Sequence, residues 1–535
     1  MFDVLIKNGL VVDGTGKPGY LADVAVKDGK IARIASAITA EAKEVIDATS
    51  LVVAPGFIDC HNHSDSYVFM GTDAYNYLEQ GVTTQICGHC GASPAPYYEG
   101  NLLRLKKSVP EEEFAVYAAQ AATPKSFFDA MEKASIGVNM AFFLGHNPLR
   151  GKVIGCGAEA PTPDQLTQMQ DYIIQAMEEG YLGYSSGLAY TPSAYADTEE
   201  LIALAKVMAP YGGIYASHIR SEGDGGIAAL EEAIQVGEQA GVQVQISHLK
   251  VVGRHNEGMS DKLLQMIDDA NARGVAVYAD QYPYTAGSAP LRSQIPPKYH
   301  VGGVKALLEK LKDPAMRQEI FQDIMHNPDG FESLVYAAGF AGSLIAASAA
   351  TKEHVGKTLT ELAQEQGKTP MDAMCDILLA NDGIVQGIYF NQNESDMQKI
   401  LAHPRVFGGS DSSNYPDERF DPETVGGRHV RGNTTMVRRL ELQRDLQICS
   451  LEEAVHRITG APAKAMHLPD QGRLEEGCPA NITVFDYDNL RVTADYQHPY
   501  RENKGICYVL VNGTLAVQNG RCTGTRSGKL LRRKA

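Results

Sequence analysis

Residues 213–248, GIYASHIRSEGDGGIAALEEAIQVGEQAGVQVQISH, contain one complete strand–helix–strand unit. The outer runs read as strands, whereas apolar residues recur at helical spacing from about 224 to 240. Each strand ends on a histidine, His218 in the first and His248 in the second. Strands that alternate with helices are typical of a parallel sheet, in which successive strands end at the same edge.

The same unit recurs along the chain. From residue 160 onward, helical patterns alternate with β-rich runs whose ends lie about 30 residues apart, the length of one strand and its crossover helix. Thr162 and Pro163 open one of these helices and Gly180 ends it. Further strands bring the count to eight, which predicts an α/β fold built on a (β/α)8 TIM-type barrel. The eight strands are the run before His61, 83–88, 138–144, 181–185, 213–218, 242–248, 275–280 and 405–411, with 384–390 as a competing candidate.

Residue types that bind zinc stand where these strands end. The run LVVAPGFIDCHNHSD, residues 51–65, places His61 and His63 two apart, so at a strand end both imidazoles point to one side. Histidine, cysteine and carboxylate side chains are the usual zinc ligands. Asp411 follows the last strand, where a carboxylate could bind a metal and also accept a proton. Since the active site of such a barrel lies at the carboxyl ends of its strands, the polar residues His61, His63, Cys90, His218, His248 and Asp411 all stand where we expect the chemistry of the protein.

Composition and charge exclude several kinds of protein. The chain has 535 residues, 44% of them hydrophobic, which is ample for a large core, and no apolar run is long enough to predict a transmembrane helix. The N-terminus reads as a strand and a turn rather than a signal peptide. A net charge of −17 argues against nucleic acid or an anionic membrane as a partner. Nine cysteines, an odd number spread along a long chain, do not look like a disulfide framework, so we expect a cytoplasmic protein.

The two ends of the chain share one pattern. Residues 1–54 and 468–535 show short β runs with tight turns, which predicts one small β-sandwich domain built from both ends. The barrel then occupies residues 55–467. Within it, residues 285–348 are too many for an ordinary loop between a strand and a helix, and long insertions on a catalytic face are often lids. We therefore expect a lid after the seventh strand.

Two local motifs admit other chemistry. Cys87-Gly-His-Cys90 could be a redox pair or half of a zinc knuckle, but no second pair follows it, so we expect one cysteine to be a metal ligand and the other to be packing. Residues 183–187, GYSSG, match the nucleophile elbow of serine hydrolases, which requires a sharp strand-to-helix turn. The sequence LAYTP follows instead, so we expect Ser186 to line a pocket or to satisfy backbone groups.

Cations follow two of the histidines. Arg220 and Lys250 stand two residues after the histidines that end their strands, so each shares a face with its histidine if the strand continues that far. Near a metal pocket these cations could bind a substrate carboxylate, for which arginine offers two parallel hydrogen bonds. An ordinary ion pair with Glu222 or Asp224 is the alternative, and the sequence does not decide between the two.

A set of short motifs stands in a fixed order along the chain. They are 55–63 (PGFIDCHNH), 81–84 (GVTT) with Cys90-Gly91, 185–190 (SSGLAY), 217–224 (SHIRSEGD), 247–250 (SHLK), 280–284 (DQYPY) and 409–411 (GSD). In this order they resemble the motifs of the N-acyl-D-amino acid deacylases, or D-aminoacylases, of the amidohydrolase superfamily. The resemblance extends along nearly the whole chain.

The resemblance implies a fold and a cofactor. The fold would be a (β/α)8 barrel with a small β-sandwich from both termini and a mobile insertion after strand seven. The cofactor would be Zn²⁺, with one tightly bound ion and a second, weaker position. The ligands of the tight ion would be Cys90, His218 and His248, and those of the weaker position His61, His63 and Asp411.

The chain departs from the family pattern at two places. His89 replaces the asparagine that usually precedes the cysteine ligand. After Asp411 the family usually reads His-Pro-Arg and then Gly-Thr-Phe-x-Arg, whereas here a longer loop leads to His429-Val-Arg431 and Thr434-Thr-Met-Val-Arg438. By the resemblance, Arg438 falls where the family places a carboxylate-binding arginine. The other residues expected to bind substrate are Lys250, Tyr282, Tyr284, Arg220, Ser186 and Tyr190.

These features predict a zinc-dependent hydrolase that cleaves the amide bond of N-acyl-D-amino acids, with Asp411 as the catalytic group that accepts and delivers a proton. Its partner would be a small molecule with a carboxylate. One alternative is a dipeptidase that acts on peptides with a C-terminal D-residue. Another is a cyclic amidase of the hydantoinase or dihydroorotase kind, which typically carries a bridging lysine that is missing after residues 181–185. A barrel that has lost catalysis would usually lose metal ligands, and none is missing here.

Overall fold

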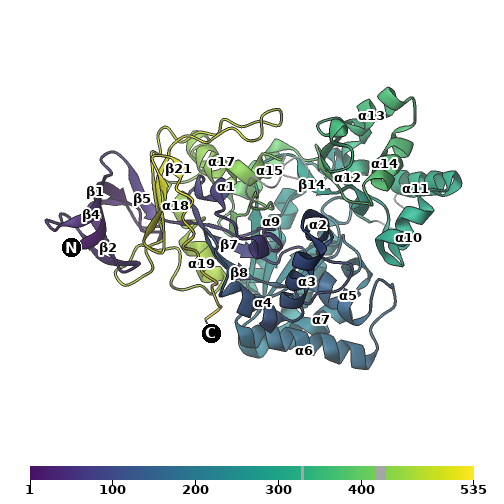
Figure 1. Cartoon of the computed structure of the whole chain (residues 1–535), viewed down its shortest axis with the longest axis horizontal. Helices are drawn as coiled ribbons and strands as arrows, with labels where there is room; N and C mark the ends of the chain where they lie inside the picture. Colours follow the sequence, from purple (N-terminus) through teal and green to yellow (C-terminus); the bar gives the residue numbers. More distant parts are fainter. Residues whose placement is uncertain (327–330, 416–428, 535) are drawn as a thin grey trace.

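Two parallel sheets form the centre of the molecule, which the computed structural model describes for residues 1–326, 331–415 and 429–534 (Figure 1). A sheet of three strands has the order β6-β7-β8, and a sheet of six has the order β17-β13-β12-β11-β10-β9. All eight strands predicted from the sequence lie in these two sheets. The predicted strand at 138–144 corresponds to two observed strands, β8 and β9, so the two sheets have nine strands. The bounds of the nine are β6 Phe57–Asp59, β7 Val82–Cys87, β8 Asn139–Phe142, β9 Leu144–Gly145, β10 Gly183–Gly187, β11 Ile214–His218, β12 Gln243–Ile246, β13 Val277–Gln281 and β17 Val406–Gly408.

Main-chain contacts join the two sheets at both flanks. On one flank the extended segment 139–145 contributes β8 to one sheet and β9 to the other. On the other flank Cys60 N donates to Gly408 O at 2.9 Å, and Asp411 N donates to His61 O at 2.8 Å. The strand ends that carry the predicted ligands therefore lie at one common edge.

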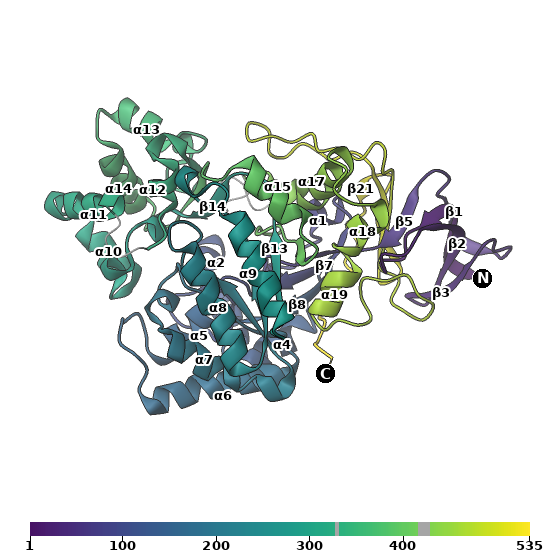
Figure 2. The same cartoon turned by 180° about the vertical axis from the view of Figure 1, so that it is seen from behind.

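Helices follow the central strands and cover their outer side (Figure 2). α6 shows how the sequence sets these elements, because Thr162 caps it in a reciprocal capping box with Gln165 and Gly180 ends it with a φ of 93°. The sequence predicted both ends of this helix. No helix in the described part of the chain is long and apolar enough to cross a membrane. The α-helices between β9 and β13 are α5 His146–Val153, α6 Pro163–Glu179, α7 Thr198–Lys206, α8 Gly226–Ala240 and α9 Ser260–Ala272.

Both ends of the chain enter one sheet of nine strands at one end of the molecule (Figure 1). Its order is β21-β20-β19-β18-β5-β1-β2-β3, with β4 beside β1, and the two ends meet where β5 pairs with β18. Buried aliphatic side chains such as Val24, Val53 and Ile482 form its core. The strands are β1 Phe2–Val11, β2 Tyr20–Lys27, β3 Lys30–Ala35, β4 Ala42–Asp47, β5 Val52–Pro55, β18 Ile482–Phe485, β19 Ile506–Val511, β20 Thr514–Gln518 and β21 Arg521–Cys522.

The last described residues leave this sheet and pack against the central strands. Gly528 N donates to Ile136 O and Leu531 N donates to Met140 O, both at 2.8 Å. Leu531 packs on the buried cluster that includes Leu182. This segment therefore contributes to the central core, although it lies inside the range 468–535 that the sequence predicted to belong to the terminal domain.

The chain from β14 to β16 forms a unit with a hydrophobic core of its own, at the other end of the molecule (Figure 1). Its antiparallel sheet has the order β14-β16-β15. Because β16 belongs to this sheet, residues 384–390 are not one of the central strands, and the inserted segment continues past its predicted end at 348. Its elements are β14 Gly287–Pro290, α10 Gly303–Lys310, α11 Pro314–His326, α12 Leu334–Ala338, β15 Ser343–Ser348, α13 Leu359–Gln366, α14 Pro370–Ala380 and β16 Val385–Tyr389.

Candidate metal centre and active site

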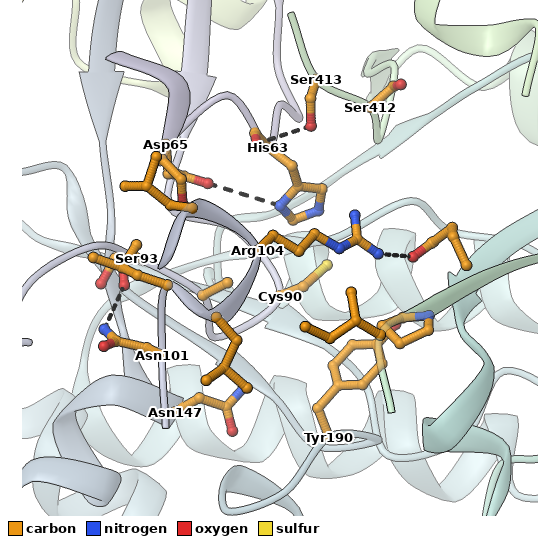
Figure 3. Close-up of a pocket in the computed structure, with 18 of the residues that line it drawn as sticks. His63, Asp65, Cys90, Ser93, Asn101, Arg104, Asn147, Tyr190, Ser412 and Ser413 are labelled. Atoms are coloured by element: carbon orange, nitrogen blue, oxygen red, sulfur yellow. Dashed lines mark hydrogen bonds and ion pairs between the residues drawn. The ribbon is translucent and has the colours of Figure 1, made fainter. Parts of the chain in front are cut away.

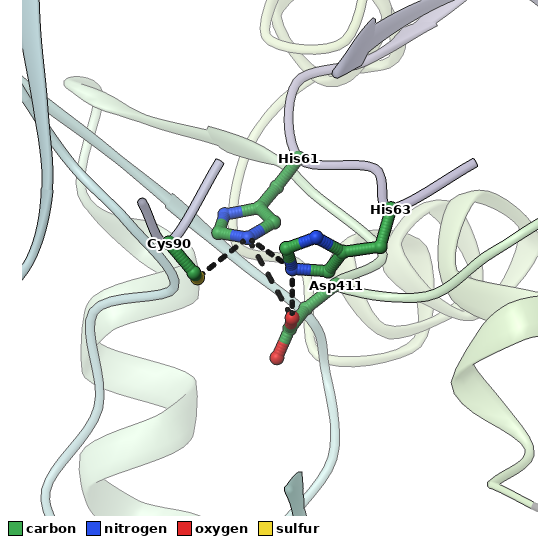
Figure 4. Close-up of side chains that lie close together, drawn as sticks. All are labelled: His61, His63, Cys90 and Asp411. Carbon is green, nitrogen blue, oxygen red and sulfur yellow. Dashed lines mark hydrogen bonds and ion pairs between the residues drawn. The ribbon is translucent and has the colours of Figure 1, made fainter. Parts of the chain in front are cut away.

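Four side chains from the ends of β6, β7 and β17 point toward one another (Figure 4). His61 Nε2 lies 3.3 Å from His63 Nε2 and 3.3 Å from Cys90 Sγ. His63 Nε2 lies 3.1 Å from Asp411 Oδ1. One donor atom from each of the four residues lies within 4.8 Å of the others, which is the separation expected around one ion.

A second group of donors shares Cys90. Its Sγ lies 3.2 Å from His248 Nε2, and that nitrogen lies 2.8 Å from His218 Nδ1. His218 ends β11 and His248 follows β12. Because Cys90 belongs to both groups, the residues form one continuous cluster. The structure thus brings together all six residues that the sequence predicted as metal ligands.

Three of these residues hold a backbone conformation that L-amino acids rarely adopt. Cys90, His248 and Asp411 have φ angles of 53°, 36° and 50°, in the left-handed region. Such a conformation costs on the order of 1–3 kcal/mol at each residue and persists only where the surrounding structure enforces it. Strain of this kind clusters at functional sites, so its presence at three of the six predicted ligands supports a functional role for the cluster.

A carboxylate lies behind each of three imidazoles of the cluster, those of His61, His218 and His248. In metal sites such a partner fixes the tautomer and the orientation of the ring. His61 Nδ1 lies 2.8 Å from Asp280 Oδ1, which leaves Nε2 directed toward Cys90 and His63. The other two contacts join His248 Nδ1 to Glu222 Oε1 at 2.9 Å and His218 Nε2 to Glu332 Oε2 at 3.2 Å.

Glu332 comes from the insertion, just before α12. Its side chain is only 6% exposed, and its second oxygen accepts a hydrogen bond from Glu222 N at 2.9 Å. The insertion therefore contacts the metal cluster through a buried carboxylate. Sequence reasoning missed this residue because it lies 114 positions after His218 in a segment without a motif.

Burial and charge together set the protonation of the cluster. Burial lowers the pKa of His61 well below its usual range and raises the pKa of the Cys90 thiol well above it. Burial also raises the pKa of Asp411, but Arg431 and the imidazoles of His248, His63 and His61 together outweigh burial and hold that pKa well below the usual carboxyl range. Neutral imidazole and ionised carboxylate are the forms that bind cations, and a bound cation deprotonates a thiol. The nitrogen, sulfur and oxygen donors present here fit Zn²⁺.

A cavity of about 400 Å³ opens on this cluster (Figure 3). His63, Cys90 and Asp411 form one part of its wall, and the segment 98–105 with residues of the insertion forms another part. This volume lies within the range of small-molecule sites in proteins. A smaller recess beside it is lined by residues that include Tyr190, His218, Lys250 and Tyr282.

Three residues predicted to bind substrate line this space. Tyr190 borders both the cavity and the recess, and its ring centroid lies 4.8 Å from that of His218. Lys250 and Tyr282 border the recess. Lys250 Nζ lies 2.5 Å from Glu222 Oε1 and 5.7 Å from the Tyr282 ring centroid. The structure therefore gives Lys250 both an ion pair and a position beside the metal cluster.

The other predicted substrate residues do not line the cavity or the recess. Ser186 is fully buried, and its hydroxyl lies 2.8 Å from the Tyr215 hydroxyl, so it forms a hydrogen bond inside the sheet. The remaining three each have a partner elsewhere: Arg220 pairs with Glu232 at 2.9 Å, Tyr284 with Thr434 at 2.5 Å and Arg438 with Glu441 at 2.9 Å.

Arg431, and not Arg438, is the arginine of their common helix that lines the cavity. It is the first residue of α17, Arg431–Asp445, and it lines the cavity. Its Nη1 lies 2.9 Å from Asp411 Oδ2, and its guanidinium carbon lies 4.6 Å from the centroid of the Tyr282 ring. The His-x-Arg motif at 429–431 was the available signal, but the longer loop before it hid the match.

The comparisons with known proteins agree with this geometry. The model of the amidohydrolase family matches residues 44–517. The chain belongs to the amidohydrolase family. Among curated proteins, a D-aminoacylase of Alcaligenes xylosoxydans xylosoxydans is 35% identical over 100% of this chain and 98% of its own length. An N-acyl-D-glutamate deacylase of the same organism is 32% identical over 100% of this chain and 97% of its own length.

Solved structures of a D-aminoacylase and of an N-acyl-D-glutamate deacylase are similar to this amidohydrolase along the whole chain. A crystal structure of D-aminoacylase superposes with a TM-score of 0.83 at 32% identity and covers 100% of both chains. An N-acyl-D-glutamate deacylase of Bordetella bronchiseptica, complexed with zinc and a phosphonate mimic of the tetrahedral intermediate, gives 0.83 at 31% identity over 99% of both chains. A D-hydantoinase gives 0.57 at 16% identity, which shows a shared fold alone.

The two other motifs of this amidohydrolase have structural roles. Ser185 donates to Gly88 O and accepts from Gly91 N, so it holds the loop that carries Cys90 and is no exposed nucleophile. Cys87 is buried, and its Sγ lies 3.8 Å from Asn62 Oδ1. His89, which departs from the family motif, stacks on His61 with ring centroids 4.1 Å apart.

Glu332→Gln should weaken zinc binding by about 10- to 100-fold, because loss of an outer carboxylate behind a ligating imidazole has effects of that size. Zinc affinity is measured on metal-free protein by competition with a chromophoric chelator. Glu309→Gln is the matched control, since Glu309 lies on α10 of the same insertion with a side chain that is 71% exposed. Equal affinities in the two variants would contradict a role for Glu332 at the metal cluster.

Proposed function

We propose that this amidohydrolase uses zinc to hydrolyse the amide bond of N-acyl-D-amino acids, releasing a carboxylate and a free D-amino acid. The observation that carries this proposal is the buried cluster of histidine, cysteine and aspartate donors with Arg431 beside Asp411. The donors suit a metal-dependent hydrolase, and the arginine suits a substrate with a carboxylate. Full-length relatives named D-aminoacylase and N-acyl-D-glutamate deacylase support the reaction.

Cys90, His218 and His248 would hold the tightly bound zinc ion, and His61, His63 and Asp411 would form a second position. The place of Cys90 supports this division, because its sulfur lies 3.3 Å from His61 Nε2 and 3.2 Å from His248 Nε2. A thiolate between the two positions would be shared by both. When bound, zinc would polarise the substrate carbonyl and lower the pKa of a water molecule to about 7.

Asp411 would perform the proton transfers. Its Oδ1 faces His63 at 3.1 Å, whereas Oδ2 faces Arg431 at 2.9 Å, so the two oxygens have separate partners. The carboxylate would accept a proton from the attacking water at Oδ1 and deliver it to the leaving nitrogen. Arg431 would hold the carboxylate in the orientation that this transfer requires.

Arg431, Lys250 and Tyr282 would bind the α-carboxylate of the substrate. Arg431 and Lys250 both lie over the ring of Tyr282, at 4.6 and 5.7 Å from its centroid, so the three groups face one region beside Asp411. Tyr190 would complete the wall of this region next to His218. A carboxylate held by two cations would set the distance between the scissile amide and the metal cluster.

The two related activities have weaker support. A dipeptide that ends in a D-residue is itself an N-acyl-D-amino acid, so dipeptidase activity would use the same residues. Cyclic amidases typically hold their metals with a lysine at the end of the fourth strand, whereas β10 ends on Ser185, Ser186 and Gly187. Likeness to hydantoinases extends to the fold only.

We further propose that the two central sheets close into one (β/α)8 barrel at 55–467, that 1–54 and most of 468–535 form the small terminal domain, and that the insertion acts as a lid. The main-chain hydrogen bonds from Cys60 N to Gly408 O and from Asp411 N to His61 O support closure of the barrel. The contact between Glu332 and His218 supports a lid that reaches the metal cluster. A cytoplasmic location is supported by the cysteines, all nine of which are free.

The first test compares N-acetyl-D-leucine with N-acetyl-L-leucine on zinc-loaded protein, with release of free amine as the readout. We expect release from the D-substrate and none above background from the L-substrate. Release from the L-substrate alone, or from neither with zinc bound, would contradict the proposal. In the second case D-terminal dipeptides and hydantoins test the two related activities.

Asp411→Asn should lower kcat by about 10²- to 10⁴-fold, because an amide cannot accept the proton that general base catalysis removes. Turnover is measured at a zinc concentration that keeps the variant saturated, with metal content checked by elemental analysis. A saturated Asp411→Asn protein with unchanged kcat would rule out the proton-transfer role.

Arg431→Met should lower kcat/KM by about 10- to 150-fold, the equivalent of one lost charged hydrogen bond. Arg438→Met is its matched control, because Arg438 lies on the same helix and contacts Glu441 rather than the cavity. The control should stay within about threefold of the unmodified enzyme. If Arg438→Met lowers kcat/KM more than Arg431→Met does, the carboxylate-binding arginine is Arg438 and not Arg431.

A further inference from the structure

One loop of the terminal sheet extends to the active site. Residues 486–505 connect β18 with β19, and in Figure 1 this loop leaves the sheet and passes α17 toward the insertion. Two hydrogen bonds hold it on α17, because Asn433 Nδ2 donates to Pro499 O at 2.7 Å and Asn503 Nδ2 donates to Asn433 O at 2.6 Å. The loop is thus docked on the helix whose first residue is Arg431.

Tyr496 of this loop packs on the insertion. Its side chain lies against a small cluster of buried apolar residues formed by Ala286, Ala346 and Ile388. Its ring also meets the ring of Phe390 edge-on, with centroids 5.0 Å apart. Aromatic pairs in this geometry are favourable beyond the area that they bury. The terminal domain therefore contacts the insertion through this side chain.

The same tyrosine covers His429, which lines the cavity and is buried. The ring centroids of Tyr496 and His429 lie 5.2 Å apart at an interplanar angle of 75°. Tyr282 and Tyr284, which follow β13, border the same imidazole with centroid distances of 6.1 and 5.9 Å. Three tyrosine rings from two distant parts of the chain thus surround one imidazole.

His429 links the insertion to Arg431. Arg431 N donates to His429 Nδ1 at 3.1 Å, so Nδ1 carries no proton and Nε2 is left to donate to Ala286 O at 2.9 Å. Burial lowers the pKa of His429 well below its usual range, which favours this neutral form. The orientation of one imidazole therefore fixes the start of α17, and with it the arginine that pairs with Asp411.

We propose that Tyr496 is a positioning residue of the active site, which holds His429 between the insertion and α17 and so keeps Arg431 beside Asp411. The described residues that line the cavity do not include Tyr496, so it acts through His429 rather than on the substrate. The proposal gives the terminal domain a part in the reaction, and it rests on the proposed function because Arg431 serves that reaction.

Tyr496→Ala should lower kcat/KM for N-acetyl-D-leucine by about tenfold, the size expected when the contacts of one aromatic ring hold a group in place. Tyr496→Phe should stay within about twofold of the unmodified enzyme, because it keeps the ring contacts. His498→Ala is the control, since His498 lies on the same loop with a side chain that is 51% exposed. Thermal unfolding of each variant shows whether it folds. A phenylalanine variant as impaired as the alanine variant would contradict the proposal.

A double-mutant cycle tests whether Tyr496 acts through Arg431. When Arg431→Met is already present, Tyr496→Ala should change kcat/KM by less than about twofold, because residues that act through one another have effects that do not add. A general loss of stability would lower kcat/KM by the same factor in both backgrounds. Additive effects of the two substitutions would therefore overturn the proposal.

Hydrogen exchange separates this proposal from the proposed reaction, because it needs no substrate. The backbone amides of residues 429–435 are followed by mass spectrometry in zinc-loaded protein. We expect faster exchange in Tyr496→Ala, with Tyr496→Phe and His498→Ala unchanged. That result would support the positioning role even if the unmodified enzyme hydrolyses no N-acyl-D-amino acid. Unchanged exchange in Tyr496→Ala, together with hydrolysis of N-acetyl-D-leucine by the unmodified enzyme, would reject the positioning role and leave the reaction in place.

Discussion

The donor groups of the metal cluster come from the ends of five strands, and the backbone after three of those strands is strained so that they can meet. Asp280 on β13 is the main contact that holds this arrangement. It lies 2.8 Å from His61 Nδ1 and accepts from His248 N and Gln245 Nε2, both also at 2.8 Å. The buried carboxylate of Asp280 thus fixes the imidazole of His61, the strained backbone of His248 and the side chain of Gln245 on the neighbouring strand β12. Local strain of about 1–3 kcal/mol is sustained where such contacts over-determine the conformation.

The insertion connects the metal cluster with the far wall of the cavity. Glu332 contacts His218, while Arg292 and Gln386 from the same unit face the cavity. These residues belong to one unit that has its own hydrophobic core, so they move together if the unit moves. A substrate that binds between them would therefore stabilise the position in which Glu332 supports a metal ligand. Binding of metal and binding of substrate are linked in such an arrangement, and the linkage is reciprocal.

The strands and the metal donors could be predicted from the sequence because both follow from local rules of secondary structure. Strand ends at a common edge follow from the alternation of strands and helices, so all six donors could be located without coordinates. The errors concern residues whose place depends on a loop or on an insertion. The sequence assigned the carboxylate-binding role to Arg438 because the loop after Asp411 is longer than the family pattern. Seven residues are about two turns, so Arg438 lies about 10 Å further along α17 than Arg431, which lies beside Asp411. Glu332 follows no periodic pattern, because only the packing of the insertion brings it to His218.

The charge of the cavity runs against the charge of the chain. The net charge is −17, yet Arg104, Arg292 and Arg431 line a single cavity. Exposed charges more than about 8 Å away are largely screened at physiological salt, so the acidic surface adds little inside the cavity. Buried cations act over short distances with less screening. The three arginines can therefore act on an anion inside the cavity in spite of the negative net charge of the chain.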